Sequence, residues 1–186
     1  MKSRQPDPLR LDVAAFTADA GDLAGDWPGS ALSRLAESQT PPQDVALADV
    51  AWQARGERKP VTGGEPELWL HLSAHTDAWL TCQRCLQPYA VPLAVDNRIR
   101  FVRGEAQAEA LDAELDDDVL ALPRALDLRE LIEDELLLGL PIVPRHDGAC
   151  PQPLPMAAGE AELPEDVPEK PHPFAALQAL KRDKPT

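Results

Sequence analysis

Two short groups of metal-ligating residue types lie far apart in this chain, and they contain all three of its cysteines. Cys82 and Cys85 form a C-x-x-C pair, and His146 and Cys150 form an H-x-x-x-C pair. A C-x-x-C turn directs two thiolates toward one point, and a histidine with a nearby cysteine can complete the Cys3His set that tetrahedral zinc accepts. The spacing therefore predicts a structural Zn2+ site with four protein ligands and no open position for chemistry.

Two further interpretations of these residues are open from the sequence alone. In the first, the cysteines are unconnected cytosolic thiols and the histidine lies on the surface. In the second, the chain is a thiol redox or zinc-dependent regulatory protein that uses the C-x-x-C pair. Thiol oxidoreductases carry this pair at a helix N-terminus, where the dipole lowers the thiolate pKa. Residues 83–88 are instead expected to form a knuckle, in which Arg84 is the only nearby charge.

The C-x-x-C pair is expected near the tip of a long β-hairpin. Leu68, Leu70 and Leu72 alternate with residues of the opposite face, and the strand continues to Cys82. Beyond the cysteines, apolar residues at positions 91, 93, 95, 99 and 101 predict the return strand, and Pro92 favours an edge position at its start. The hairpin of residues 66–102 is the predicted centre of a mostly antiparallel sheet.

The H-x-x-x-C pair is expected just after a helix over residues 128–138, with Asp127 as its N-cap. The predicted apolar stripe is Leu128, Leu131, Ile132 and Leu136, and the residues predicted to face solvent are Glu130, Glu133 and Asp134. Gly139 and Pro141 end the helix. The prolines that follow are suited to deliver His146 and Cys150 to a fixed place.

The remaining elements are predicted from weaker patterns. Ser30 is the expected N-cap of a helix near residues 30–37. A strand is expected from Val45 to Trp52 and is broken by the charged residues 55–60. Residues 104–118 are expected to form an acidic, solvated loop, followed by a short strand over residues 119–122.

These patterns predict an α+β fold with a single domain over residues 1–150. Its mostly antiparallel sheet is built around the long β-hairpin, with two or three packed helices and an irregular C-terminal tail. Hydrophobic residues make up 44% of the chain and aromatic residues only 4%, so the core is expected to be aliphatic.

Residues 151–186 are predicted to be a flexible tail rich in proline and acidic residues, which ends in a short amphipathic helix. Phe174, Leu177 and Leu180 recur at i, i+3 and i+6, so this segment can dock on its own domain or in a groove of a partner. The predicted partner-binding residues are Lys170, Pro171, Pro173, Phe174, Leu177, Leu180 and Lys181.

Three motifs in this order resemble the YceD family of bacterial and plastid proteins. They are the C-x-x-C pair after a strand, the run from Glu133 to Pro144 before His146, and the run from Lys170 to Ala175 before Leu177, Leu180 and Lys181. The resemblance implies a role in ribosome biogenesis, acting on synthesis, processing or stability of large-subunit (23S) ribosomal RNA. It implies no established catalytic residue, so a non-enzymatic role is expected.

The net negative charge of the chain limits the chemical classes of partner that are expected. The formal net charge is −14, from 32 acidic and 18 basic residues, which repels phosphate backbones and favours basic partners. Acidic residues concentrated over 105–135 are by themselves typical of a solvated face; together with the family resemblance they favour a ribosomal protein or a large-subunit precursor particle as the partner. Direct RNA contact through Arg98, Arg100 and Arg103 is a weaker alternative, because so few arginines give little affinity.

The sequence gives no reason to expect a small-molecule substrate or a membrane. Residues 1–10 are basic, but no apolar run of a signal peptide follows, and no stretch approaches the length of a membrane span. An odd number of cysteines without an export signal is typical of a reducing compartment. The expected location is the cytoplasm.

Overall fold

The computed structural model describes residues 6–152. One five-stranded sheet is formed by β1 (Asp22–Trp27), β2 (Val50–Lys59), β3 (Glu67–Thr81), β4 (Pro88–Val102) and β5 (Asp118–Ala121). The helices are α1 (Val13–Ala18), α2 (Ser33–Glu37), α3 (Glu105–Asp112) and α4 (Leu128–Leu138), with a 3-10 turn η1 (Gly29–Ala31). The strands lie in chain order and pair antiparallel, except that β5 is parallel to β4. The predicted α+β fold is confirmed.

The predicted hairpin is formed by β3 and β4, which pair from Leu68 opposite Phe101 to Thr81 opposite Pro88. The leucines of β3 point to one face, and both Leu70 and Leu72 are almost fully buried there. β5 pairs only with residues 99–102 of β4. The earlier part of β4, which includes Pro92, therefore has β3 as its one partner strand among the described residues.

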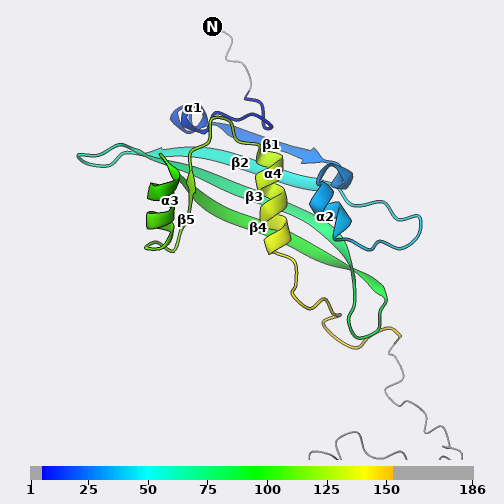
Figure 1. The fold of residues 1–186 in the computed structure, drawn as a ribbon. Helices are drawn as coiled ribbons and strands as arrows, with labels where there is room; N and C mark the ends of the chain where they lie inside the picture. The colour runs from blue at the N-terminus through cyan, green and yellow to red at the C-terminus, as the bar shows by residue number, and fades with distance from the viewer. Residues whose placement is uncertain (1–5, 153–186) are drawn as a thin grey trace, which may run out of the picture. The chain divides into compact units, whose positions relative to one another are not determined.

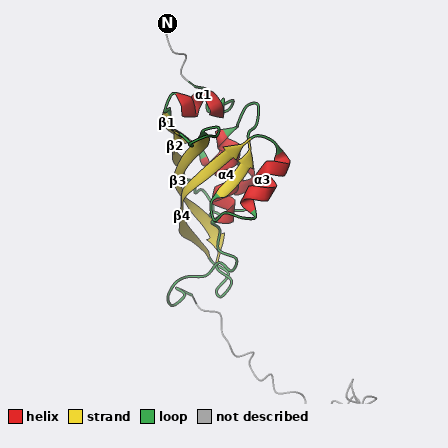
Figure 2. Cartoon of the chain, turned by 90° about the vertical axis from the view of Figure 1, so that its left-hand side faces the viewer, coloured by secondary structure: helices red, strands yellow, loops and turns green. Residues whose placement is uncertain are grey.

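Helices α1, α2 and α4 contribute to the main core on one face of the sheet, and α4 crosses in front of the strands (Figure 1). The side view shows α4 standing off one side of the strands (Figure 2). Ile132 and Leu136 of α4 join Leu70 and Ile99 in this core. Helix α3 instead packs on β5 and the end of β4, in a small separate cluster. Within residues 6–152, none of the helices combines the length and apolar character needed to cross a bilayer.

The first 60 residues differ from the sequence-based expectation. Helix α1 and strand β1 were not predicted, and Ser30 lies inside η1 instead of capping a helix. Strand β2 begins at Val50 and continues through the charged residues that were predicted to break it. Arg55 and Glu57 face the outer side of the sheet, where they contact Asp22 and His71, while Gly56 between them is buried.

Gly56, which the sequence suggested was part of a break, is required where α1 meets β2. A Cβ atom at this position would lie 2.8 Å from the Phe16 carbonyl oxygen and 2.9 Å from the Thr17 Cα. The missing side chain therefore permits the backbone of α1 to approach the strand directly.

Residues 105–112, predicted to be part of a loop, form α3. Their alanines gave little apolar signal, but Ala108 and Leu111 lie three residues apart and reach Val102 and Val119. The short strand that was predicted after this segment is confirmed as β5.

Helix α4 has the predicted bounds and the predicted cap, because Asp127 Oδ1 accepts hydrogen bonds from the backbone N–H groups of Arg129 and Glu130. The prediction that Glu133 faces solvent was wrong. Its side chain is buried and accepts from the backbone N–H groups of Arg34, at 2.6 Å, and Leu35, at 3.0 Å. Since Leu32 supplies no side-chain cap, Glu133 of α4 caps the start of α2 from a distant part of the chain.

Candidate metal centre

The two cysteines of the C-x-x-C pair lie in a hydrogen-bonded knuckle at the tip of the β3–β4 hairpin. The Cys82 N–H donates to the Gln87 carbonyl at 3.0 Å, and the Leu86 N–H donates to the Cys82 carbonyl at 2.8 Å. Cys82 and Cys85 are both buried. The backbone of this turn therefore fixes the positions of the two thiols before any ligand is considered.

The second ligand pair lies on residues 139–150, here called the strap, which runs from the end of α4 toward the hairpin tip (Figure 1). The Gln83 N–H donates to the Pro144 carbonyl at 2.8 Å. The guanidinium of Arg84 donates to the carbonyls of His146 and Gly148, the latter at 2.6 Å. Residues inside the C-x-x-C turn thus hold the strap against the knuckle.

The structure brings the four predicted ligands together. The Sγ atoms of Cys82 and Cys150 lie 3.9 Å apart, and Cys85 Sγ lies 3.7 Å from His146 Nδ1. One donor atom from each of the four residues lies within 4.8 Å of all the others. Tetrahedral zinc with Zn–S bonds of about 2.3 Å separates its sulfur ligands by roughly 3.8 Å, so the donor set fits this geometry. A Cys3His group in this arrangement could hold a metal ion.

Tyr89, the second residue of β4, packs against the imidazole of His146. Their ring centroids are 4.6 Å apart, and the planes are tilted by 35°. This contact restrains the ring while its Nδ1 atom faces Cys85. Neither Tyr89 nor the clamping role of Arg84 was predicted, because their only sequence signal is proximity to the C-x-x-C pair.

The pKa values of Cys82 and Cys150 are shifted in opposite directions, which favours a thiolate at Cys82 and a thiol at Cys150. Burial disfavours the charged form of Cys82, but hydrogen bonds from the backbone N–H groups of Arg84, His146 and Cys85 lower its pKa to about 5. Burial raises the pKa of Cys150, and the neighbouring sulfurs of Cys85 and Cys82 raise it further, to about 11. Binding of a divalent cation would displace the proton of the Cys150 thiol, because metal ligation requires thiolates.

The surroundings of the C-x-x-C pair differ from those of a dithiol redox site. Residues 83–87 form a turn and not the first turn of a helix, so no helix dipole acts on the thiols. The third cysteine and a histidine lie at the same point, and none of the three cysteines forms a disulfide. The convergence of four donors supports metal binding over dithiol exchange.

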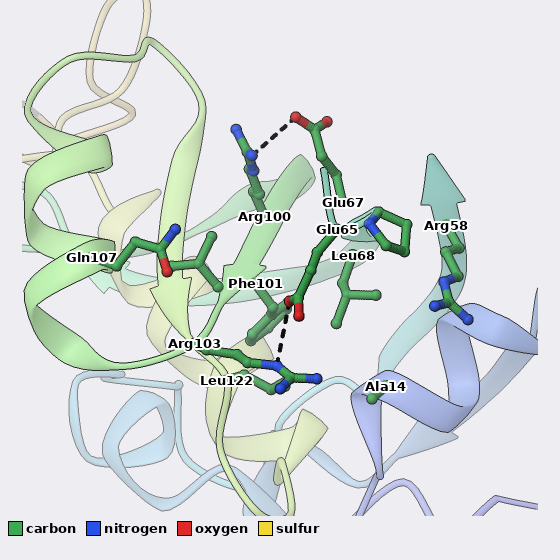
Figure 3. Close-up of a pocket in the computed structure, with 12 residues that line it drawn as sticks. Ala14, Arg58, Glu65, Glu67, Leu68, Arg100, Phe101, Arg103, Gln107 and Leu122 are labelled. Carbon is green, nitrogen blue, oxygen red and sulfur yellow. Dashed lines mark ion pairs between the residues drawn. The ribbon is translucent and has the colours of Figure 1, made fainter. Parts of the chain in front are cut away.

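The three arginines proposed for RNA contact all have acidic partners. Arg98 pairs with Asp117 at 2.6 Å, Arg100 with Glu67 at 2.9 Å, and Arg103 with Glu65 at 3.7 Å. Figure 3 shows the last two pairs among the residues that line a cavity of about 280 Å³, together with Ala14 of α1 and Gln107 of α3. Arg98 also lies over the ring of the buried Trp69, at 4.5 Å. These contacts reduce the positive potential that this face can offer to RNA.

The predicted partner-binding residues Lys170, Pro171, Pro173, Phe174, Leu177, Leu180 and Lys181 lie outside the described residues. The predicted flexible tail over residues 151–186 does so as well, except for its first two positions.

Comparison with known proteins assigns the family. A family model described as "Large ribosomal RNA subunit accumulation protein YceD" matches residues 70–181, which is more than half of the chain. A protein of Haemophilus influenzae with the same name is 29% identical over 175 residues, covering 94% of this chain and 96% of the relative. No solved structure matches the chain. The match begins within the β3–β4 hairpin, includes all four candidate ligands and reaches Lys181, so the chain belongs to the YceD family of large ribosomal RNA subunit accumulation proteins.

Proposed function

We propose that this chain is a non-enzymatic assembly factor that acts in the cytoplasm and supports the accumulation of large-subunit ribosomal RNA. Its direct partner would be a basic ribosomal protein or a basic face of a precursor particle. Membership of the YceD family is the observation that carries the proposal. The net charge of −14 supports a basic partner over bare RNA, because the field of the molecule repels phosphates.

Some of the acidic residues over 105–135 already form ion pairs within the domain and are less available to a basic partner. Glu133 and Asp134 pair with Arg34, and Asp117 pairs with Arg98. Four exposed acids on and after α3 have no ion pair within the described residues, and they are here called the α3 acidic surface: Glu105, Glu109, Glu114 and Asp116. Charges of this kind steer association more than they add to the final affinity.

Neutralising the α3 acidic surface tests the basic partner. The variant Glu105→Gln/Glu109→Gln/Glu114→Gln/Asp116→Asn is expected to recover ribosomal proteins roughly tenfold less well than the parent chain in affinity purification at low salt. A matched control makes the same charge change at four exposed acids elsewhere: Asp26→Asn, Glu37→Gln, Asp49→Asn and Asp77→Asn. Equal recovery by the two variants would exclude the α3 acidic surface as the contact.

We propose that the C-terminal segment contributes a second, apolar contact through Phe174, Leu177 and Leu180, flanked by Lys170 and Lys181. The family match extends through this segment, beyond the α+β domain, which supports a shared function for it.

The variant Phe174→Ala/Leu177→Ala/Leu180→Ala tests this contact in cells that lack the parent gene. It is expected not to restore large-subunit RNA, which should remain low relative to small-subunit RNA. The control Leu154→Ala/Leu163→Ala/Val167→Ala truncates three apolar side chains of the same tail and is expected to restore it. Restoration by both variants would contradict this role.

A further inference from the structure

We propose that Cys82, Cys85, His146 and Cys150 together bind one Zn2+ ion, which joins the strap to the hairpin tip and fixes the point where the C-terminal segment leaves the domain. The juxtaposition of these four residues is the starting observation, since all of their donor atoms lie within 4.8 Å of one another. They come from two segments that share no secondary-structure element.

The sulfur and nitrogen donors of the site favour zinc over other common metal ions. Three thiolates and one imidazole are a soft set that suits zinc, whereas magnesium and calcium require oxygen ligands. The short distances between donors suit a single metal ion, because a cluster with two irons needs its ligand pairs spread over two metal atoms. Four protein donors close the tetrahedron, so the ion has a structural role and no position for a substrate.

The site is prepared by contacts that do not involve the metal. The knuckle is closed by its own backbone hydrogen bonds, and the Gln83 N–H and the Arg84 guanidinium hold the strap. Tyr89 packs on the imidazole, as groups around metal ligands commonly do to fix their orientation. Arg84 also brings a positive charge beside a site whose net charge with zinc and three thiolates is negative.

Beyond its contacts with the knuckle, the strap makes few contacts with the rest of the domain, so the ion is expected to stabilise the strap and the knuckle but not the whole fold. Ile142 is 99% exposed and Val143 is 57% exposed, and neither joins the main core. A segment with few buried apolar contacts opens at low free energy. Among the strap residues only Leu140, next to the end of α4, packs against the main core. Metal removal is therefore expected to release residues 141–150 and the knuckle while the sheet remains folded.

The ion also connects the domain to the proposed partner contact. Cys150 is the last ligand, and the tail of residues 151–186, which carries the C-terminal segment, follows it directly. Bound zinc thus fixes the origin of the tail against the hairpin tip. Only this consequence rests on the proposed function, and the metal site can be tested without it.

The full chain, purified under reducing conditions with added zinc and then dialysed, is expected to retain one zinc per chain by elemental analysis. Cys150→Ser and His146→Ala are expected to lose it, and both changes lie on the strap, outside the core, so the variants should keep the parent circular dichroism spectrum. His75→Ala, which removes an exposed histidine of β3, is the control and should retain zinc. Arg84→Ala is expected to weaken zinc affinity by about 10–100-fold, as loss of outer contacts to metal ligands does.

Two further measurements distinguish a tetrahedral zinc site at these four residues from a redox dithiol or from zinc bound elsewhere. Cobalt substitution is expected to give the intense visible bands of a tetrahedral thiolate site, and chelation is expected to increase hydrogen exchange at residues 82–87 and 141–150 but not in β2 or α4. A chain that stays free of zinc and forms a Cys82–Cys85 disulfide would overturn the proposal, as would zinc retained equally by Cys150→Ser and His75→Ala. A zinc-loaded chain that fails to recover ribosomal proteins would leave the metal site intact and reject only the proposed function.

Discussion

The variant Glu133→Ala is expected to lose about 2–4 kcal/mol of unfolding free energy, because it leaves two backbone N–H groups at the start of α2 without an acceptor. Glu133 Oε1 accepts from both Arg34 and Leu35, and the Leu35 N–H is buried. Its Oε2 accepts from the Arg34 side chain at 3.1 Å. Urea unfolding followed by circular dichroism measures the loss, and an unchanged slope with denaturant would show that the folded state stays compact.

Asp134→Ala is the matched control for this prediction. Asp134 pairs with the same Arg34 but is 49% exposed, so its removal is expected to cost less than about 1 kcal/mol. Glu133→Gln keeps a neutral acceptor and is expected to fall between the two. Equal losses for Glu133→Ala and Asp134→Ala would show that the ion pair matters and the helix cap does not.

The variant Ile132→Ala is expected to destabilise the domain by about 2–5 kcal/mol, through lost burial and the cavity that remains. Ile132 is fully buried between α4 and the sheet, in the same core as Leu70 and Ile99. Leu138→Ala provides the comparison on the same helix, because Leu138 is 82% exposed and its truncation should change stability by less than about 0.5 kcal/mol. Thermal and urea unfolding measure both, and similar losses would contradict the observed packing face of α4.

The elements that were predicted correctly carry their signal locally. The β3–β4 hairpin has one buried face, which produces the alternation of its leucines. Helix α4 has a capping aspartate before its apolar stripe. In both cases a short window of sequence contains the residues that decide the structure.

The elements that were missed depend on partners that are distant in sequence. Glu133 resembles a solvent-facing residue of an amphipathic helix, and only the position of Arg34, 99 residues away, makes it a buried cap. In β2, Arg55 and Glu57 lie on either side of the buried Gly56, and the charged residues from Arg55 onward were mistaken for a break. Helix α3 buries mainly one alanine, so its sequence gives little apolar periodicity.

The candidate metal site was predictable in composition but not in geometry. Residue types and spacing identified the four donors, because zinc restricts its ligands to a few side chains. Their convergence depends on where α4 ends relative to the hairpin tip, and on the strap contacts of Gln83 and Arg84. The spacing within the C-x-x-C and H-x-x-x-C pairs contains no information about the position of α4 or about these contacts.

The order of the strands has a consequence for the nascent chain. Strands β1 to β4 pair in the order in which they are synthesised, so the strand pairs of the antiparallel part of the sheet include no residue beyond Val102. Cys85 then precedes His146 by 61 residues. While these residues are being synthesised, Cys82 and Cys85 lie at the hairpin tip without the two later ligands, His146 and Cys150. An oxidant could then form a disulfide between the two cysteines. Oxidation of this pair before His146 is synthesised would remove two ligands of the candidate metal site, so we expect reducing conditions during translation to favour its assembly.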